Sequence, residues 1–114
     1  MDIILQKMEE FLIVELKGKV NTLTSPILEK RLLELITDHQ HNLLIDFSQS
    51  DYISSAGLRV LLIALKQLKT VHGRVVLCGQ NKCVKEVFDI TGFSQLFKIF
   101  PTRAEAVKEL TQVS

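Results

Sequence analysis

Two adjacent serines offer the clearest chemistry in this sequence. Ser54 and Ser55 follow a polar loop and precede Ala56, Gly57 and a strongly apolar helical pattern. A serine that caps a helix stabilises it by about 1 kcal/mol. Free backbone N–H groups and the positive end of the helix dipole also favour an anion there. Because a phosphoryl group adds about 1.5 to 2 negative charges, we expect phosphorylation here to leave the domain folded.

Nucleophilic catalysis by these serines is not expected. A Gly-x-Ser-x-Gly hydrolase needs a downstream acid and a histidine, and Ile53 stands where the first glycine would be. The only later histidine, His72, ends the same predicted helix, about 25 Å from Ser55 at ~1.5 Å per residue. We therefore predict a binding protein rather than an enzyme.

The sequence also predicts no metal and no cofactor. His39 and His41 lie in a predicted loop without a Cys partner or HExxH spacing. Neither a Gly-x-Gly-x-x-Gly loop nor a phosphate-binding P-loop motif occurs. Cys78 and Cys83 form no CxxC pair, so we expect two reduced, mostly buried thiols in a cytoplasmic protein.

Composition indicates one folded domain. The 114 residues are 46% hydrophobic and 24% charged, with a formal net charge of +1. The longest apolar run, Val60 to Leu65, is far shorter than the ~18 residues of a membrane span, and no signal peptide is evident at the N-terminus. The basic residues lack interleaved aromatics, so no direct nucleic-acid binding is expected. A monomer is the default expectation.

Alternating hydrophobic patterns predict an α/β fold. The expected elements are strands 3–7 and 11–17, a helix from Ser25 that fades near 38–42, strand 43–47, a helix from the 54–55 pair to Gly73, strand 74–79, helix 81–91, strand 96–100 and helix 102–111. This order, ββαβαβαβα, implies a mixed, mostly parallel sheet of about five strands with four helices and right-handed crossovers.

Local signals set several of these boundaries. Ser25 followed by Pro26 predicts an N-cap with proline at the first helical position. Gly92 is expected to end the third helix in a left-handed conformation. Thr102 and Glu105 match a capping box for the last helix.

The segment around the two serines resembles the signature of the STAS domain family, most closely its single-domain bacterial members, the anti-sigma factor antagonists. The motif comprises 44–48, Leu-Ile-Asp-Phe-Ser, and 52–62, Tyr-Ile-Ser-Ser-Ala-Gly-Leu-Arg-Val-Leu-Leu. Segments 16–21, 76–79 and 87–93 resemble flanking parts of the same family. The resemblance implies a STAS domain over residues 1–114 with a SpoIIAA-like fold.

The resemblance also implies which residues act. The family's phosphorylated residue lies two positions before the glycine of a Gly-Leu pair, which is Ser55 here. Ser54 and Asn21 stand where the family often has aspartate. These two departures from the family pattern remove two carboxylates near Ser55. We therefore expect kinase recognition to differ, and Ser54 becomes an alternate acceptor.

We expect a partner-binding surface around this junction. Gly57 would permit close approach of the partner, Arg59 would lie on the exposed side of its helix, and the loop after the second strand would border the site. The expected partner-binding residues are Asn21, Thr22, Ser54, Ser55, Ala56, Gly57 and Arg59.

The implied function is partner switching. Unphosphorylated antagonist binds an anti-sigma factor that is also a serine kinase, and this releases a sigma factor. The kinase then phosphorylates the antagonist, and a serine/threonine phosphatase resets it. Two alternatives stay open: an accessory subunit of a lipid-transport ATPase that is not phosphorylated, and a small ligand-binding domain.

Overall fold

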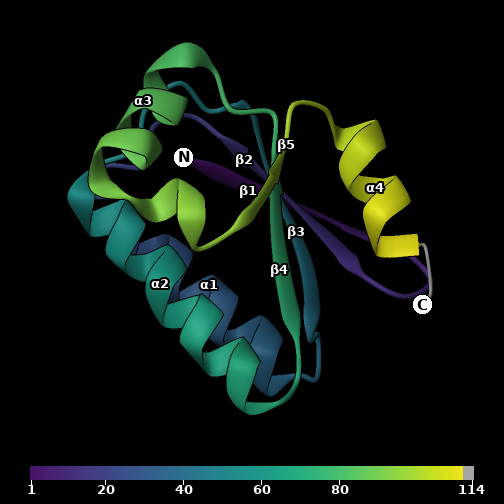
Figure 1. The fold of residues 1–114 in the computed structure, drawn as a ribbon. Helices are drawn as coiled ribbons and strands as arrows, with labels where there is room; N and C mark the ends of the chain where they lie inside the picture. The colour runs from purple at the N-terminus through teal and green to yellow at the C-terminus, as the bar shows by residue number, and fades with distance from the viewer. Residues whose placement is uncertain (112–114) are drawn as a thin grey trace.

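The structure, a computed structural model, describes residues 1–111. The last three residues of the domain expected over 1–114 therefore lie outside the described part. All nine predicted elements occur in the predicted order (Figure 1). They are β1 (Asp2–Lys7), β2 (Leu12–Lys17), α1 (Ser25–Thr37), β3 (Asn42–Gln49), α2 (Ser55–Thr70), β4 (Arg74–Cys78), α3 (Lys82–Thr91), a short 3₁₀ helix η1 (Phe93–Gln95), β5 (Lys98–Phe100) and α4 (Arg103–Thr111).

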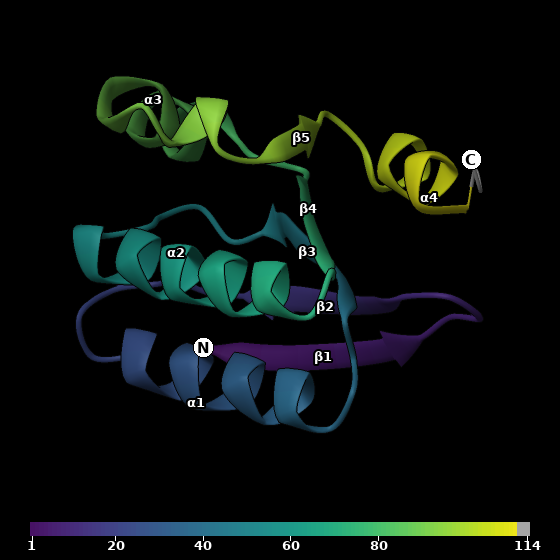
Figure 2. The ribbon, with the colours of Figure 1, turned by 60° about the horizontal axis from the view of Figure 1, so that its bottom comes forward.

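The strands form one sheet in sequence order, β1-β2-β3-β4-β5. β1 pairs antiparallel with β2, and the other three pairings are parallel. This confirms the mixed, mostly parallel sheet. Right-handed crossovers that always step to the next strand place their helices on the same face, so α1 and α2 lie side by side against the sheet while α4 covers the opposite face (Figure 2).

The sheet is consequently buried on both faces. The larger core lies beneath α1, α2 and α3 and contains Leu12, Val14 and Leu16, the strand face expected to be buried. A smaller core lies beneath α4 and includes Ile13 of the same strand and Phe11, which directly precedes it. The central strands therefore have no solvent-facing side, which explains their nearly continuous apolar sequences.

Helix α1 begins differently from the prediction. Thr24, not Ser25, is its N-cap, so Pro26 is the second helical residue. Ser25 is buried, and its hydroxyl donates a hydrogen bond of 2.5 Å to the backbone oxygen of Asn21. The Ser25 hydroxyl, which was expected to cap α1, is thus bonded to the loop that precedes the helix.

Two further expectations need correction at the C-terminal side. The fifth strand starts at Lys98 rather than 96, because η1 occupies 93–95 and leaves Leu96 exposed. Cys83 is exposed, although Cys78 is buried. The left-handed Gly92 is confirmed by its φ of 80°. Of the predicted capping box, the structure shows one bond, in which the Thr102 hydroxyl accepts from the Glu105 backbone N–H at 3.2 Å.

No helix among residues 1–111 is long and apolar enough to span a membrane. Nor does the range contain a cluster of three or more His, Cys, Asp or Glu side chains that could hold a metal ion.

Candidate functional site

The candidate site lies where the parallel strands end. β2, β3 and β4 finish at the same edge of the sheet, and the helices that follow them start there (Figure 1). This is the edge at which α/β folds gather their binding sites. We call it the switch edge, defined by residues 18–24, 50–59 and 81.

Ser54 caps helix α2, as predicted. It has extended backbone geometry, with φ −93° and ψ 171°, and its Oγ accepts a hydrogen bond from the backbone N–H of Gly57 at 3.2 Å. Ser55 is the first helical residue and is exposed. Because Ser54 performs the capping, the Ser55 hydroxyl is left facing solvent beside the free N–H groups of the first turn.

Backbone hydrogen bonds join the two loops of the switch edge. The Val20 N–H donates to the Tyr52 oxygen at 2.9 Å, and the Ser54 N–H donates to the Val20 oxygen at 2.8 Å. Val20 also forms a parallel β-bridge with Ile53. The sheet is thus extended by one residue pair, which places the loop of Asn21 next to the start of α2.

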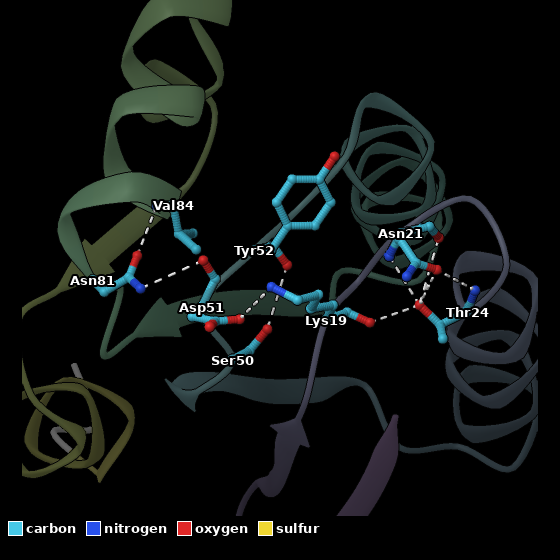
Figure 3. A network of polar contacts seen from close by, with 8 residues as sticks. All are labelled: Lys19, Asn21, Thr24, Ser50, Asp51, Tyr52, Asn81 and Val84. Carbon is cyan, nitrogen blue, oxygen red and sulfur yellow. Dashed lines mark hydrogen bonds and ion pairs between the residues drawn. The ribbon is translucent and has the colours of Figure 1, made fainter.

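The Asn21 side chain organises its own loop rather than pointing freely outward. Its Oδ1 accepts a hydrogen bond from the backbone N–H of Thr24 at 3.0 Å (Figure 3). It also accepts one from the backbone N–H of Leu23 at 3.0 Å. The Thr24 hydroxyl donates to the Lys19 oxygen at 2.7 Å and closes the turn. Thr22 is exposed on this loop. The structure therefore brings Asn21 and Thr22 to the edge predicted from sequence.

Gly57 makes close contacts inside the domain itself. It is buried, and a Cβ added there would lie 2.7 Å from Val20 Cγ1 and 2.8 Å from Ile53 Cγ1. The absence of a side chain lets helix α2 pack closely against Val20 and Ile53. Ala56 is half-buried beside it, and Arg59 is exposed as predicted.

Exposed apolar side chains surround the site, and the sequence reasoning missed them. Leu23 is 84% exposed, Ile27 54% and Tyr52 44%. Leu23 and Ile27 are four residues apart at the start of α1. The sequence contained a signal for them. Both are large apolar residues beside a polar loop, and neither fits the buried stripe of α1.

A set of weak polar contacts frames the loop between β3 and α2. Lys19 Nζ lies 3.4 Å from Asp51 Oδ1 and 5.5 Å from the centre of the Tyr52 ring (Figure 3). Asn81 caps α3, because its Oδ1 accepts a hydrogen bond from the Val84 N–H at 2.8 Å. Its Nδ2 donates to the backbone oxygen of Asp51 at 3.5 Å. The loop after β2, the loop before α2 and the start of α3 therefore meet here through solvent-accessible contacts.

The strongest charge cluster lies elsewhere, under α4. Arg103 Nε donates to Asp46 Oδ2 at 2.7 Å, and its NH2 group to Glu15 Oε2 at 2.8 Å. Burial alone would raise the pKa of Asp46, but hydrogen bonds from Ser48 and Arg103 outweigh it and hold that pKa below its ordinary value. Burial and the Asp46 charge raise the pKa of the Cys78 thiol to about 12. This cluster binds helix to sheet and keeps Cys78 protonated.

The chain belongs to the STAS domain family, which it matches over residues 2–106. The match confirms the family inferred from the motif around the two serines. The five-stranded sheet and four α-helices also agree with solved structures of this fold.

Relatives of this chain bear names from one regulatory class. A protein of Bordetella bronchiseptica, provisionally named anti-sigma factor antagonist BtrV, is 39% identical over 106 residues, covering 93% of this chain and 91% of that protein. The anti-sigma F factor antagonist of Paenibacillus polymyxa is 27% identical over 104 residues, covering 90% and 89%. The anti-sigma factor antagonist SpoIIAA, solved in its unphosphorylated form, has a TM-score of 0.86 at 17% identity, covering 99% of each chain.

Proposed function

We propose that this chain is an anti-sigma factor antagonist that is switched off by phosphorylation of Ser55. Family membership and the names of relatives that span most of the chain support the class. The observation that carries the switch is the exposed hydroxyl of the first residue of α2, left free because Ser54 caps the helix. In this function the chain is a binding module and a kinase substrate, not an enzyme.

The local electrostatics favour a phosphoryl group on Ser55. Helix α2 has 16 residues and no acidic side chain in its first turn, so its N-terminal dipole is not offset there. A negative charge at such a position stabilises a helix by about 0.3–1 kcal/mol. Arg59 follows four residues later on the same helix, the spacing at which an anion and a cation attract each other. The modified domain is therefore expected to stay folded.

The same phosphoryl group would oppose binding of a partner. Leu23, Ile27 and Tyr52 supply exposed apolar area in and beside the loops of the switch edge. An interface that covers them would bring a doubly charged group into a poorly hydrated environment, which costs free energy unless the partner pairs it. Since each 1.4 kcal/mol changes affinity tenfold, a penalty of a few kcal/mol is enough to release the partner.

The proposed partners follow from this switch. The anti-sigma factor binds the unphosphorylated switch edge, frees its sigma factor and acts as the serine kinase, and a serine/threonine phosphatase restores the hydroxyl. Asn21, Thr22, Ser54, Ala56 and Arg59 border the contact, and Ser54 is the alternate acceptor. Use of ATP by the kinase places the switch in the cytoplasm.

Phosphorylation in vitro tests the proposal directly. The purified chain is incubated with ATP and the candidate anti-sigma factor kinase of its source organism, and modified residues are mapped by mass spectrometry. We expect one phosphoryl group on Ser55 and, in a Ser55→Ala variant, only minor modification at the alternate acceptor Ser54. Ser54→Ala serves as the matched control and retains the modification. Phosphorylation of Ser55→Ala at the wild-type level would contradict the assignment.

Binding measurements test the second half. Ser55→Ala should bind the kinase as the wild type does, whereas Ser55→Asp should bind at least about tenfold more weakly, because a carboxylate imitates part of the phosphate charge. Equal binding by the two variants would contradict the switch. If pull-downs from source cells recover a lipid-transport ATPase subunit and no kinase, the accessory-subunit alternative is favoured instead.

A further inference from the structure

The outer edge of strand β1 has no partner strand among the described residues, 1–111. The sheet ends in β1 on one side and in β5 on the other, but β5 has three residues whereas β1 has six. Proteins commonly protect such an edge with a proline, a bulge or a charge in its middle. β1 pairs with β2 in unbroken register, and its only charges are the end residues Asp2 and Lys7. Its outward backbone N–H and C=O groups are therefore available to another strand.

Ile4, in the middle of β1, is incompletely covered in the single chain. Its side chain is 42% exposed, whereas Ile3 and Leu5 point to the opposite face and pack against the larger core. Glu15, the cross-strand neighbour of Ile4, pairs with Arg103 of α4, so Ile4 lies on the α4 side of the sheet. Helix α4 packs mainly on β3, β4 and β5. An additional strand beside β1 would cover Ile4 with a second side chain.

Helix α1 runs beside this edge in the same direction as β1 (Figure 2). One hollow between them is lined by the start of β1 and by residues between 27 and 34, and the next by Leu5 and residues between 30 and 38. Lys30, Arg31 and Glu34 line both hollows and are exposed, as is Asp38 in the second. None of these four takes part in an ion pair found among residues 1–111. We call them the charged stripe.

The charged stripe is complementary to a reversed copy of itself. Its basic residues, Lys30 and Arg31, precede its acidic residues, Glu34 and Asp38. A second α1 that runs in the opposite direction would bring acidic residues beside basic ones at both ends of the contact. The middle of the stripe lies level with Ile4, because its shared residues line the hollows on both sides of that position. A two-fold axis near Ile4 would therefore reverse strand and helix together.

Two-fold pairing of β1 with a second β1 also selects one register. A residue at the axis faces itself, and residues at equal distances on either side of it face each other. With Ile4 at the axis, Ile3 faces Leu5 of the second copy. In the same register Asp2 faces Gln6, whose amide can donate a hydrogen bond to the carboxylate. An axis one residue earlier or later would instead place a charged end residue opposite an isoleucine, so the register centred on Ile4 is preferred.

We propose that two copies of this chain form a symmetric dimer in which their β1 strands pair antiparallel about Ile4. The two sheets become one, which pairs both open edges and covers each Ile4 with the other. The charged stripes of the two α1 helices meet across the axis, so that Arg31 of each copy faces Glu34 of the other. This dimer replaces the monomer expected by default from the sequence. Its contact residues lie outside the switch edge, so the proposal goes beyond the antagonist function and does not depend on Ser55.

Analytical ultracentrifugation of the full chain tests the dimer. Up to about 1 mM protein we expect a reversible monomer–dimer equilibrium, because even a dissociation constant of that size leaves much of the chain dimeric. Ile4→Lys would place two ammonium groups opposite each other and should weaken association at least about tenfold. Ile90→Lys, at an 85% exposed position of α3 outside the contact, is the matched control without effect. Circular dichroism checks that both variants fold. A chain that stays monomeric, or an Ile4→Lys variant that dimerises like the wild type, overturns the proposal.

Charge reversal tests the contact between the two helices. Arg31→Glu and Glu34→Arg should each weaken dimerisation about tenfold, because each variant places like charges face to face across the axis. The double variant restores opposite charges at the same two positions and should recover most of the wild-type affinity. A double variant that dimerises no better than the single ones would contradict the antiparallel contact of the α1 helices and overturn the proposal.

Disulfide trapping tests the register. In a Cys83→Ser background, which removes the exposed native thiol, Ile4→Cys should be oxidised by copper phenanthroline to a disulfide-linked dimer. Directly opposed residues have Cβ atoms about 4.5–5.5 Å apart, close to disulfide geometry. Gln6→Cys is the matched control on the same face, because its two copies would lie about 13 Å apart along the strands and should not be trapped. Equal trapping at the two positions overturns the register and with it the proposal.

Discussion

The switch edge and the face beneath α4 both gather polar side chains, but they hold them differently. At the switch edge Thr22, Tyr52 and Ser55 are exposed, and the contacts that join the loops are backbone hydrogen bonds such as those of Val20. Beneath α4 the Asp46 side chain is 2% exposed and is held by Arg103, itself 36% exposed. The proposed phosphorylation of the exposed Ser55 would add charge at little structural cost, whereas Asp46 cannot lose its charge or its partner without weakening the fold.

Removal of Asp46 is expected to give the largest loss of stability. Asp46→Ala would leave the Ser48 N–H and the Arg103 guanidinium without this acceptor and would open space in the smaller core. Breaking a buried ion pair typically costs about 3 kcal/mol or more, and the exposure of Arg103 places this case at the lower end. Urea unfolding should therefore show a loss of about 3 kcal/mol in the free energy of unfolding.

The matched control for this prediction is Asp51, the exposed carboxylate of the switch edge. It pairs with Lys19 at 3.4 Å in solvent, and such pairs contribute about 0–1 kcal/mol. Asp51→Ala should change the free energy of unfolding by less than about 0.5 kcal/mol. Comparable losses in the two variants would remove the distinction between the regions.

Substitution of Gly57 is expected to give the next largest effect. Gly57→Val places methyl groups against Val20 and Ile53, where even a Cβ would be closer than 3 Å. Overpacking of this kind typically costs about 2 kcal/mol. Since Val20 and Ile53 position the loops of the switch edge, kinase binding should weaken as well. Ala56→Val, at the half-buried neighbour, is the control, and a Gly57→Val protein as stable as this control would contradict the packing role.

Acid should reveal the depressed pKa of Asp46 as a smaller effect. A folded-state pKa below the value of about 3.9 expected in an unfolded chain means that ionised Asp46 stabilises the fold above that pH. This contribution is lost as the pH falls through the lower, folded-state pKa. The test is the free energy of unfolding measured from about pH 5 down to about pH 2. As the pH falls, this free energy should decrease less steeply in Asp46→Asn than in the wild type. Equal slopes would contradict the depressed pKa.

What the sequence predicted well was local. The Ser54 cap, the left-handed Gly92 and the Thr102 cap depend on residues within one or two turns, and the structure confirms all three. The order of elements followed from hydrophobic periodicity, which changes from two residues in a strand to 3.6 in a helix. The exposed position of Ser55 followed from these same local signals.

What the sequence did not predict depends on contacts between distant segments. Gly57 is buried against Val20, which is 37 positions earlier by residue number. Arg103 reaches Asp46 across 57 positions. Single-sequence patterns carry no information about these two long-range pairings until the sheet order is known. The N-cap of α1 at Thr24 is a local exception: Asn21 Oδ1 accepts from the Thr24 N–H, and the Asn21 backbone oxygen accepts from the Ser25 hydroxyl that was expected to cap the helix.

The smallest change in stability is expected for substitutions of Ser55. These substitutions test most directly whether the switch edge differs from the face beneath α4. Ser55→Ala removes an exposed hydroxyl and should alter the free energy of unfolding by less than about 0.5 kcal/mol. Ser55→Asp should be neutral or slightly stabilising, because a negative charge favours the N-terminus of α2. Ser54→Ala, by contrast, loses the bond to the Gly57 N–H and should cost about 1 kcal/mol.

These three variants can be compared by thermal and urea unfolding in one buffer. If Ser55→Ala costs as much as Ser54→Ala, the Ser55 hydroxyl has a structural role and is not free to be modified. If the predicted order holds, the two adjacent serines have different roles. Ser54 stabilises the fold by capping α2, and the Ser55 hydroxyl can be modified without a loss of stability. A proposed penalty of about 3 kcal/mol on partner binding would lower affinity about a hundredfold, whereas the same charge would change the free energy of unfolding of the domain by about 1 kcal/mol or less.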